Sequence, residues 1–461
     1  MKIMHVSLGL PPLRTGGLTK YSVDLMLEQK QQSHEVVLVY PGHTTWPRIT
    51  RVERCEDYEG IEVYEIVNPL PVPLLGGIRR PHAFMKESPR EPFQLFLQQL
   101  QPDVIHFHTF MGVHKELLEA AKAVGIRMVY TTHDYFGICP KVNLLDQAGQ
   151  VCRNFRQGLG CVSCNEHGYS LAMIYMMQSR VYSRFKNSYM VKQLRRRVRS
   201  RSVSMDAQSG ISTRFGYQDH PLASAYLELR AYYMDMFHLM DRLHFNSSVS
   251  RDEYGKHGLT HGDVVTIRHR DITDQRRLKL FLEDQPLRIT YLGPVDHYKG
   301  FGLLKRSLDQ LLVQSTEAWH LHIYGNDVVP TNWDKAKYTF HGKYHYSELN
   351  TILEQTDLLI VPSVWKETFG FVGLEGLAHA VPMVVSRYAG CKDLIQDGIT
   401  GWICEPHEMS LVQHLDTIVK NRDLLRKMNR RMLAMEIDFT MSTHAMDITD
   451  WYSNAYEEVL L

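Results

Sequence analysis

The stretch PSVWKETFGFVGLEGLAHAVPMVVS, residues 362–386, decides how the second half of this chain folds. The apolar run DLLIVPS (357–363) leads into it and is typical of a buried strand. The segment from about Gly370 to His379 has the pattern of a short helix, and PMVVS (382–386) is a further strand. This order of strand, loop, helix and strand predicts a parallel sheet covered by helices.

The loop between that strand and that helix has the features of an anion site. The first N–H groups of the helix point at the carboxyl-terminal edge of the sheet, where they and the helix dipole favour a diphosphate. Gly370 allows the backbone to approach a ligand because it has no Cβ. Glu367 precedes the helix and Glu375 lies one to two turns into it, where a carboxylate can accept hydrogen bonds from vicinal hydroxyls. Two glutamates alone are also explained as solvated surface carboxylates.

Apolar strands alternate with amphipathic helices on both sides of this stretch. The expected strands are 2–8, 35–40, 103–108 and 127–133 in the first half, and 287–293, 320–325, 338–342, 357–363 and 382–386 in the second. A chain of 461 residues is too long for one core. We therefore expect two α/β domains with parallel sheets, at 1–265 and 285–443. The polar segment 252–286 holds the linker between them, and an amphipathic helix at 444–461 ends the chain.

The composition excludes several classes of protein. Lys plus Arg (52) nearly balance Asp plus Glu (51), so the whole molecule is not a polycation, and we expect no nucleic-acid partner. No apolar run approaches the roughly 20 residues that span a bilayer, and the first residues read as a strand rather than a signal peptide. We expect a cytoplasmic protein, with peripheral attachment to the inner face of the membrane left open.

Further motifs occur in a fixed order along the second half: YLGPVDHYKG (291–300), HIYGN (322–326), HGKYHYSELNTILEQTDLLIVPSVW (341–365), KETFGFVGLEG (366–376) and DGITGWICEP (397–406). Together they closely resemble the family-4 glycosyltransferases and their Glu-x7-Glu signature. The resemblance implies a GT-B fold, in which two Rossmann-like domains face each other and the last helix crosses back to the first domain. It is looser before residue 285, where it rests on Gly16–Gly17 and on THD (132–134).

The resemblance also implies an activity. We expect a retaining hexosyltransferase that needs no metal and moves a sugar from a nucleoside-diphosphate sugar, UDP-linked in preference to GDP-linked. The acceptor would be a glycan or a lipid-linked molecule in the synthesis of a cell-surface polysaccharide or glycolipid. The implied catalytic residues are Glu367, His133 and Lys299, and the implied donor-binding residues are Gly16, Gly17, Lys299, Glu367, Phe369, Gly370, Phe371, Val372 and Glu375.

One position departs from the family pattern. Many members have an arginine directly after the strand glycine, but here Pro294 follows Gly293, and only His297 is a nearby candidate to replace that charge. A catalytically weak relative that binds glycans or serves as a partner subunit therefore stays an alternative. A nucleotide-sugar epimerase of the same fold is a second alternative.

Four of the seven cysteines fall in one segment of the first half: Cys139, Cys152, Cys161 and Cys164. The last two form a C-x-x-C pair, a spacing found in zinc knuckles, and four thiolates suit a structural zinc. Reduced thiols without a metal explain the pattern equally well. These residues begin an insertion that runs over about 139–205.

The second part of the insertion, 169–205, is basic. It has repeated Lys and Arg residues, Met, Tyr, Leu and Ile at roughly helical spacing, and no acidic residue. Such a helix suits the surface of an anionic membrane. A solvated basic face without a partner is the alternative.

Overall fold

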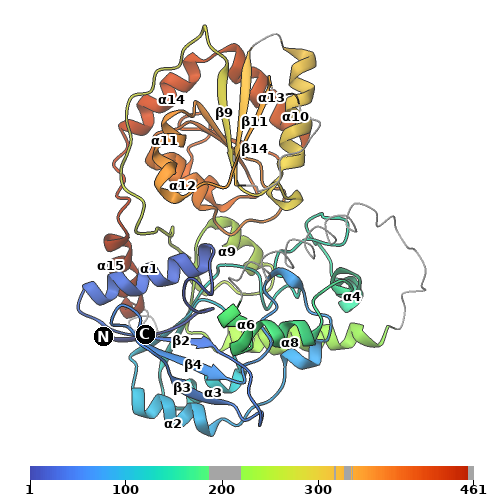
Figure 1. The fold of residues 1–461 in the computed structure, drawn as a ribbon, viewed down its shortest axis with the longest axis vertical. Coiled ribbons are helices and arrows are strands. Elements are labelled where there is room, and N and C mark those ends of the chain that lie inside the picture. The colour runs from blue at the N-terminus through green and yellow to red at the C-terminus, as the bar shows by residue number, and fades with distance from the viewer. Residues whose placement is uncertain (186–219, 316–317, 326–333, 335, 455–461) are drawn as a thin grey trace.

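The computed structural model describes residues 1–185, 220–315, 318–325, 334 and 336–454. Figure 1 shows two lobes stacked along the long axis of the molecule, each built around one sheet. The first half of the chain forms one lobe and most of the second half forms the other. The two α/β domains expected from the sequence are therefore present.

The N-terminal sheet has the strand order β3-β4-β2-β1-β5-β6-β7-β8. All neighbouring strands are parallel except the β3–β4 pair, which is antiparallel. The strands are β1 (Lys2–Val6), β2 (Glu35–Pro41), β3 (Arg51–Arg54), β4 (Glu62–Val67), β5 (Val104–Phe107), β6 (Arg127–Thr131), β7 (Arg242–Phe245) and β8 (Gly262–Val264). The central strands are buried on both faces, as expected for a parallel sheet covered by helices.

The C-terminal sheet is parallel throughout, in the order β11-β10-β9-β12-β13-β14. Its strands are β9 (Leu287–Leu292), β10 (Trp319–Tyr324), β11 (Tyr338–Gly342), β12 (Leu358–Val361), β13 (Met383–Ser386) and β14 (Trp402–Cys404). The strand at 357–363 predicted from the sequence is the buried strand β12 in the middle of this sheet. Its carboxyl end leads directly into the loop with Glu367.

Helices cover both sheets. In the first lobe they are α1 (Gly17–Gln31), α2 (Glu91–Leu100), α3 (Lys115–Ala123), α4 (Leu159–Asn165), α5 (Leu171–Met177), α6 (Arg180–Phe185), α8 (Pro221–His238) and α9 (Ser248–Gly255). In the second they are α10 (Phe301–Gln314), α11 (Leu349–Glu354), α12 (Phe371–Ala378), α13 (Glu408–Lys420) and α14 (Asp423–Leu433). The predicted helix from about 370 to 379 is α12.

The last described helix, α15 (Met441–Asn454), returns to the first domain and packs beside α1 (Figure 1). The Tyr21 hydroxyl lies 2.9 Å from Nε2 of His444, and Trp451 Nε1 donates to Asp263 at 2.9 Å. Apolar side chains of both helices share one core cluster with the second domain. The predicted crossover helix is confirmed, although it begins three residues earlier than expected and residues 455–461 lie outside the described part.

Part of the segment 252–286 is regular structure, contrary to the expectation from the sequence. Helix α9 extends to Gly255, and β8 adds an edge strand to the first sheet. The connection between the domains therefore begins after Val264. The short strands β3, β4, β7, β8 and β14 were also not predicted.

The α15 interface predicts a specific loss of stability. Ile448 is fully buried in the cluster that joins α15 to α1 and the second domain. We expect Ile448→Ala to lower the free energy of unfolding by about 2–4 kcal/mol, because it removes packed methyl groups and leaves a cavity. Met446→Ala on the same helix is the control, since Met446 is 48% exposed. Urea unfolding measures both variants, and equal losses would contradict the described docking of α15.

Candidate active site

The loop before α12 adopts the strand-to-helix turn that the sequence predicts. Gly370 is the N-cap of α12 and has a φ of 95°, a conformation that other residues rarely adopt. No side chain caps the helix, so its first N–H groups stay available to a ligand. Phe369 is buried beneath this turn, whereas Phe371 and Val372 are partly exposed at its start. The backbone from Phe369 to Val372 therefore surrounds the positive end of the helix.

Glu367 is buried and held from two sides. Lys299 forms an ion pair with its Oε1, and the Ser363 hydroxyl donates to its Oε2 at 2.5 Å. Lys299 itself follows β9 and lies with its ammonium 5.6 Å from the centre of the Trp365 ring. The two residues predicted to bind the donor from separate motifs thus form one ionic pair at the carboxyl edge of the sheet.

Glu375 is also buried, but one of its carboxylate oxygens has no hydrogen-bond partner among the described residues. Its other oxygen lies 3.8 Å from Nε2 of His269, a residue of the inter-domain connection. The rings of Phe371 and Tyr346 enclose His269 edge-on. Burial, and next the charge of Glu375, raise the pKa of Tyr346 above its usual value. A buried acceptor without a donor is costly, so this oxygen is an exception among the buried polar atoms of the site.

The glycine loop of the first domain meets this site. Gly16 is the N-cap of α1 with a φ of 115°, and no side chain caps that helix either. A Cβ on Gly17 would lie 3.5 Å from the ring of Phe371. The starts of α1 and α12 therefore come together across the domain boundary, and both present helix N–H groups to the same region.

His133 lies at the same junction. Its backbone carbonyl accepts a hydrogen bond from Thr368 Oγ1 at 2.8 Å, and its ring lies 5.0 Å from that of Tyr21 on α1. Burial lowers its pKa to about 3, so the ring is neutral. The carbonyl of Thr368 in turn accepts from the Ser247 hydroxyl at 2.5 Å. The loop with Glu367 is thus fixed to the first domain by two hydrogen bonds.

The position of Pro294 carries no cation. Its carbonyl accepts a hydrogen bond from the Tyr291 hydroxyl at 2.7 Å. His297 is directed toward the first domain, where its Nε2 lies 3.3 Å from the carbonyl oxygen of Gly149. That contact joins the insertion to the second domain. It gives His297 a structural partner in place of the charge-replacing role considered from the sequence.

The four cysteines of the insertion are free thiols that lie near one another. Burial raises the pKa of Cys161 to about 12 and that of Cys164 to about 11, and the neighbouring thiols, Cys139 and Cys152 among them, add to both shifts. A zinc ion would reverse these shifts. In the described part of the chain, some groups of three or more side chains bring their ligand atoms within 4.8 Å of one another, close enough to share a metal ion. The four Sγ atoms do not form such a group. As they stand they do not form a closed zinc site, and zinc binding stays a prediction.

The basic segment is described only in part. Helices α5 and α6 come from it, whereas residues 186–219, with most of its Lys and Arg, lie outside the described residues. Arg180 contacts Glu65 at 3.4 Å and Glu53 at 3.8 Å, so this one cation is used within the domain. No helix in the described residues is both long enough and apolar enough to cross a bilayer.

A hollow of about 760 Å³ lies away from this site, at the amino-terminal edge of the first sheet. Met1, Asp103, Arg127 and Tyr452 are among the residues that line it. It adjoins the point where the described chain ends, beyond Asn454. Ligands of open α/β sheets bind at the opposite, carboxyl edge, so we place no donor there.

The sequence analysis missed several residues of the site. Ser363 and His269 contact the two glutamates, and Cys391 lies under the turn, 3.5 Å from where a Cβ of Gly370 would be. Ser363 ends the quoted strand, four residues before Glu367, and could have been noticed there. His269 comes from a segment without a pattern, so only the three-dimensional structure reveals it.

Two family models match the chain. Residues 15–156 match the model described as Glycosyltransferase Family 4, and residues 273–433 match the one described as Glycosyl transferases group 1. Together they cover more than half of the chain and include both sides of the site.

Curated relatives match over shorter segments. A D-inositol 3-phosphate glycosyltransferase of Nocardia farcinica is 31% identical over 108 residues, which are 23% of this chain and 24% of the relative. An uncharacterized 41.2 kDa protein in the cps region of Klebsiella pneumoniae is 27% identical over 124 residues, 26% of this chain and 34% of the relative. The matched segments thus span about a third or less of these relatives.

Solved structures match over nearly the whole length. Sucrose-phosphate synthase from Thermosynechococcus elongatus has a TM-score of 0.56 at 13% identity and covers 99% of both chains. The Anabaena protein HepE in complex with UDP has a TM-score of 0.56 at 13% identity, over 98% of this chain and all of that one. These similarities confirm the GT-B fold. With both family matches in place, the chain belongs to the group 1, family-4 glycosyltransferases.

Proposed function

We propose that the protein transfers a sugar from a nucleoside-diphosphate sugar, UDP-linked in preference, to a glycan or lipid-linked acceptor with retention of configuration. The two buried carboxylates at the start of α12 carry this proposal. Glu367 is oriented by Lys299 and Ser363. Glu375, in the second turn of α12, has a carboxylate oxygen without a hydrogen-bond partner among the described residues. In this proposal Glu375 accepts from ribose hydroxyls and Glu367 from hydroxyls of the transferred sugar. HepE, which has the same fold, was solved with UDP, in support of the uridine donor.

The diphosphate would lie between the starts of α1 and α12. Lys299 and the free N–H groups after Gly16 and Gly370 supply positive potential there. Arg14, in the loop before Gly16, has no carboxylate partner among the described residues, and burial lowers its pKa. These groups stabilise charge that grows on the leaving diphosphate. An oxygen of that diphosphate then assists removal of the acceptor proton on the same face of the sugar, and no protein nucleophile is used.

The first domain would hold the acceptor. Gly16 and Gly17 and the His133 ring lie where the two domains meet, next to the proposed sugar position. The basic segment 169–205 belongs to the same domain, and its charges suit an anionic membrane that contains a lipid-linked acceptor. We therefore propose peripheral attachment to the inner face of the membrane and a role in the assembly of a cell-surface polysaccharide or glycolipid.

A test at Glu367 separates this proposal from its two alternatives. We expect Glu367→Gln to reduce sugar transfer by roughly 100-fold or more, because the neutral amide loses the ion pair with Lys299 and accepts only weakly from the sugar through one oxygen. Glu405→Gln is the control, since Glu405 is a partly exposed ion-pair partner of Arg387. Transfer and donor isomerisation are measured together by chromatography of the products. Isomerised donor without transfer would indicate an epimerase, and binding without either product would indicate a catalytically weak relative.

A second test addresses the nucleoside. We expect Glu375→Gln to weaken UDP binding about 10- to 100-fold, because hydrogen bonds to a charged acceptor contribute about 1.5–3 kcal/mol. Calorimetric titration with UDP measures the dissociation constant, and GDP is titrated in parallel. Unchanged UDP affinity in the variant would contradict the proposed hydrogen bonds between the ribose and Glu375. Tighter binding of GDP than of UDP would reverse the preferred donor.

A third test addresses the membrane. We expect the protein to sediment with vesicles that contain anionic lipid at low salt. Replacement by Gln of Arg195, Arg196, Arg197, Arg199 and Arg201 should weaken this binding at least about tenfold, because each basic residue near the surface contributes about 1 kcal/mol. Replacement of the exposed residues Lys427, Arg430 and Arg431 on α14 is the control. Equal binding to neutral vesicles, or no binding at all, would refute the membrane role.

A further inference from the structure

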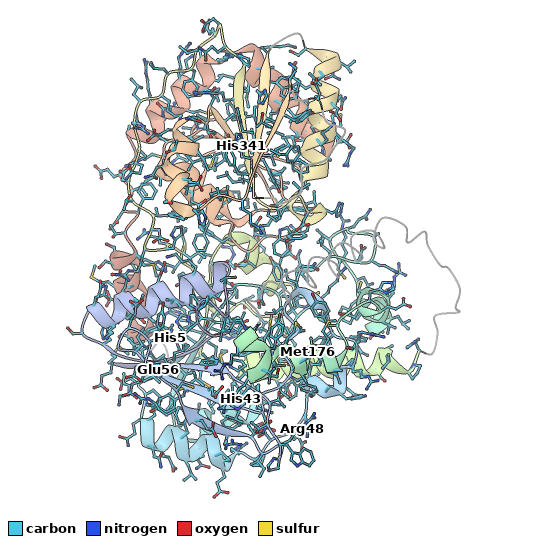
Figure 2. The ribbon with its side chains drawn as sticks, in the orientation of Figure 1. His5, His43, Arg48, Glu56, Met176 and His341 are labelled. Carbon is cyan, nitrogen blue, oxygen red and sulfur yellow. The ribbon has the colours of Figure 1, made fainter. Side chains whose placement is uncertain are left out.

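Six histidines gather on the face of the first sheet that α1 and α15 cover. They are His5, His106, His108, His133, His244 and His444, and all except His133 are fully or almost fully buried. Figure 2 labels His5 near α1. The ring nitrogens of His5, His106 and His108 lie within 4.8 Å of one another, as in a metal site. Every one of those nitrogens, however, already has a hydrogen-bond partner, so the cluster is a network without a vacant ligand position.

The direction of this network is fixed at its far end. Nε2 of His244 lies 2.7 Å from the carbonyl oxygen of Val265, which only accepts, so Nε2 has the proton. Burial lowers the pKa of His244 to about 4, and the neutral ring therefore has a lone pair on Nδ1. That lone pair accepts from the Thr131 hydroxyl at 2.9 Å. Since the hydroxyl has one proton, Thr131 must accept from Nε2–H of His106, which is 2.6 Å away.

The chain of hydrogen bonds continues from His106 through Tyr452 of α15 to Gln29. Burial also lowers the pKa of His106, so its Nδ1 has no proton and accepts from the Tyr452 hydroxyl at 2.7 Å. The Tyr452 oxygen then accepts from Nε2 of Gln29 at 3.3 Å. Thr449 accepts from the same amide nitrogen, because its own proton goes to the Ala445 carbonyl. A flipped Gln29 amide would place its oxygen against two hydroxyls that have no proton left to give.

Gln29 transmits this direction to the active site. Its oxygen accepts from Nε2–H of His5 at 2.8 Å, which leaves a lone pair on His5 Nδ1. That lone pair accepts from Nε2–H of His108 at 3.0 Å. Nδ1 of His108 then accepts from Nε2–H of His133 at 3.2 Å. Burial lowers the pKa of His5 to about 4 and that of His108 as well, so each ring is neutral and has a single proton.

We propose that this chain of hydrogen bonds holds His133 as the neutral tautomer with its proton on Nε2, so that Nδ1 serves as the acceptor for a hydroxyl group of the bound sugar. Nδ1 of His133 has no hydrogen-bond partner in the described part of the chain, and the residue is partly exposed beside the loop of Glu367. The ligand in this statement rests on the proposed function, whereas the tautomer does not.

The chain orients a proton without transporting one. Its last acceptor is the carbonyl of Val265, which cannot take up a proton and pass it on. The residues between Val265 and His133 are therefore positioning residues, because they act on the substrate only through the His133 ring. Gln29 and Tyr452 connect the two halves of the network, because they link His106 and His244 on one side to His5 and His108 on the other. The crossover helix thereby sets the hydrogen-bonding character of a residue at the carboxyl edge of the first sheet.

The tautomer is measured directly in the ligand-free, full-length protein. Labelling of histidine with ¹⁵N and long-range proton–nitrogen correlation spectra distinguish the two neutral tautomers and the charged ring, and a His133→Asn variant assigns the signal. We expect His133 near neutral pH to have its proton on Nε2. A proton on Nδ1, or a doubly protonated ring, would overturn the proposal, whether or not the protein transfers a sugar.

Tyr452→Phe tests the connection through α15. Without the Tyr452 hydroxyl, the Gln29 amide nitrogen keeps only Thr449 as acceptor, and the Thr449 hydroxyl can turn away from the Ala445 carbonyl to donate to a flipped amide oxygen, so we expect a second population of His133 with its proton on Nδ1. Thr449→Val is the matched control, because the Tyr452 oxygen, whose proton goes to His106, still accepts from Gln29 and keeps the amide orientation. The proposal fails if Tyr452→Phe leaves a single Nε2–H tautomer, or if Thr449→Val changes the tautomer as strongly.

Kinetics then test the ligand. Tyr452→Phe should lower kcat/KM for the intact donor in proportion to the population with its proton on Nδ1, up to about tenfold, which is the effect of losing one hydrogen bond in every molecule. A series of donor sugars, each lacking one hydroxyl group, identifies the contact. The donor that lacks the hydroxyl bound by His133 should be used equally well by the variant and by the unmodified enzyme. An equal loss for every donor would indicate a general structural effect and would refute the role of His133 as the hydroxyl acceptor. The spectra test the tautomer and the donor series tests the sugar contact, so either result can contradict its part of the proposal without the other.

Discussion

The structure depends most on the requirement that a buried carboxylate be paired. Two glutamates are buried, one before α12 and one in its second turn, where an isolated negative charge is costly to desolvate. The helix dipole alone does not offset that cost, and Glu367 is satisfied by Lys299 and Ser363 from two other elements of the sheet edge. Glu375 keeps an unsatisfied oxygen, so part of its desolvation cost is not offset within the described structure. In the proposed function, a ligand with hydroxyl groups would offset it.

The same loop also determines how the two domains meet. Thr368, next to Glu367, donates to His133 and accepts from Ser247, and both partners belong to the first domain. The carboxylate of Asp393 accepts from the backbone N–H of Ser248 at the start of α9. A negative charge at this end of a helix also interacts favourably with the helix dipole. These contacts join the domains at the loop that contains Glu367, while α15 joins them at the far side. The active-site geometry therefore depends on both contacts.

The sequence predicted those parts whose pattern is local. The strand at 357–363, the turn at Gly370 and helix α12 follow from consecutive residues, and the motif order led to the correct fold. Strand β3 was missed because it is short and lies at the antiparallel edge of the sheet, where burial is incomplete. Ser363 lies four residues before Glu367 and could have been noticed, whereas His269 comes from a segment without a pattern. The histidine network was missed for another reason, because it depends on the register of strands, in which His5 lies opposite His106, and on a helix more than 300 residues away. Histidines within buried strands were the available signal.

The direction of the histidine network is robust because it cannot be reversed in part. A reversal at any one member would place two protons, or two lone pairs, between the same two atoms, and a buried unsatisfied polar group costs about 1–3 kcal/mol. Reversal of the whole network would leave Nε2 of His244 without a proton against the Val265 carbonyl. Each bond in such a chain polarises the next, so the members support one orientation together. A helix that returns from the second domain can therefore define the state of one ring near the substrate without touching it.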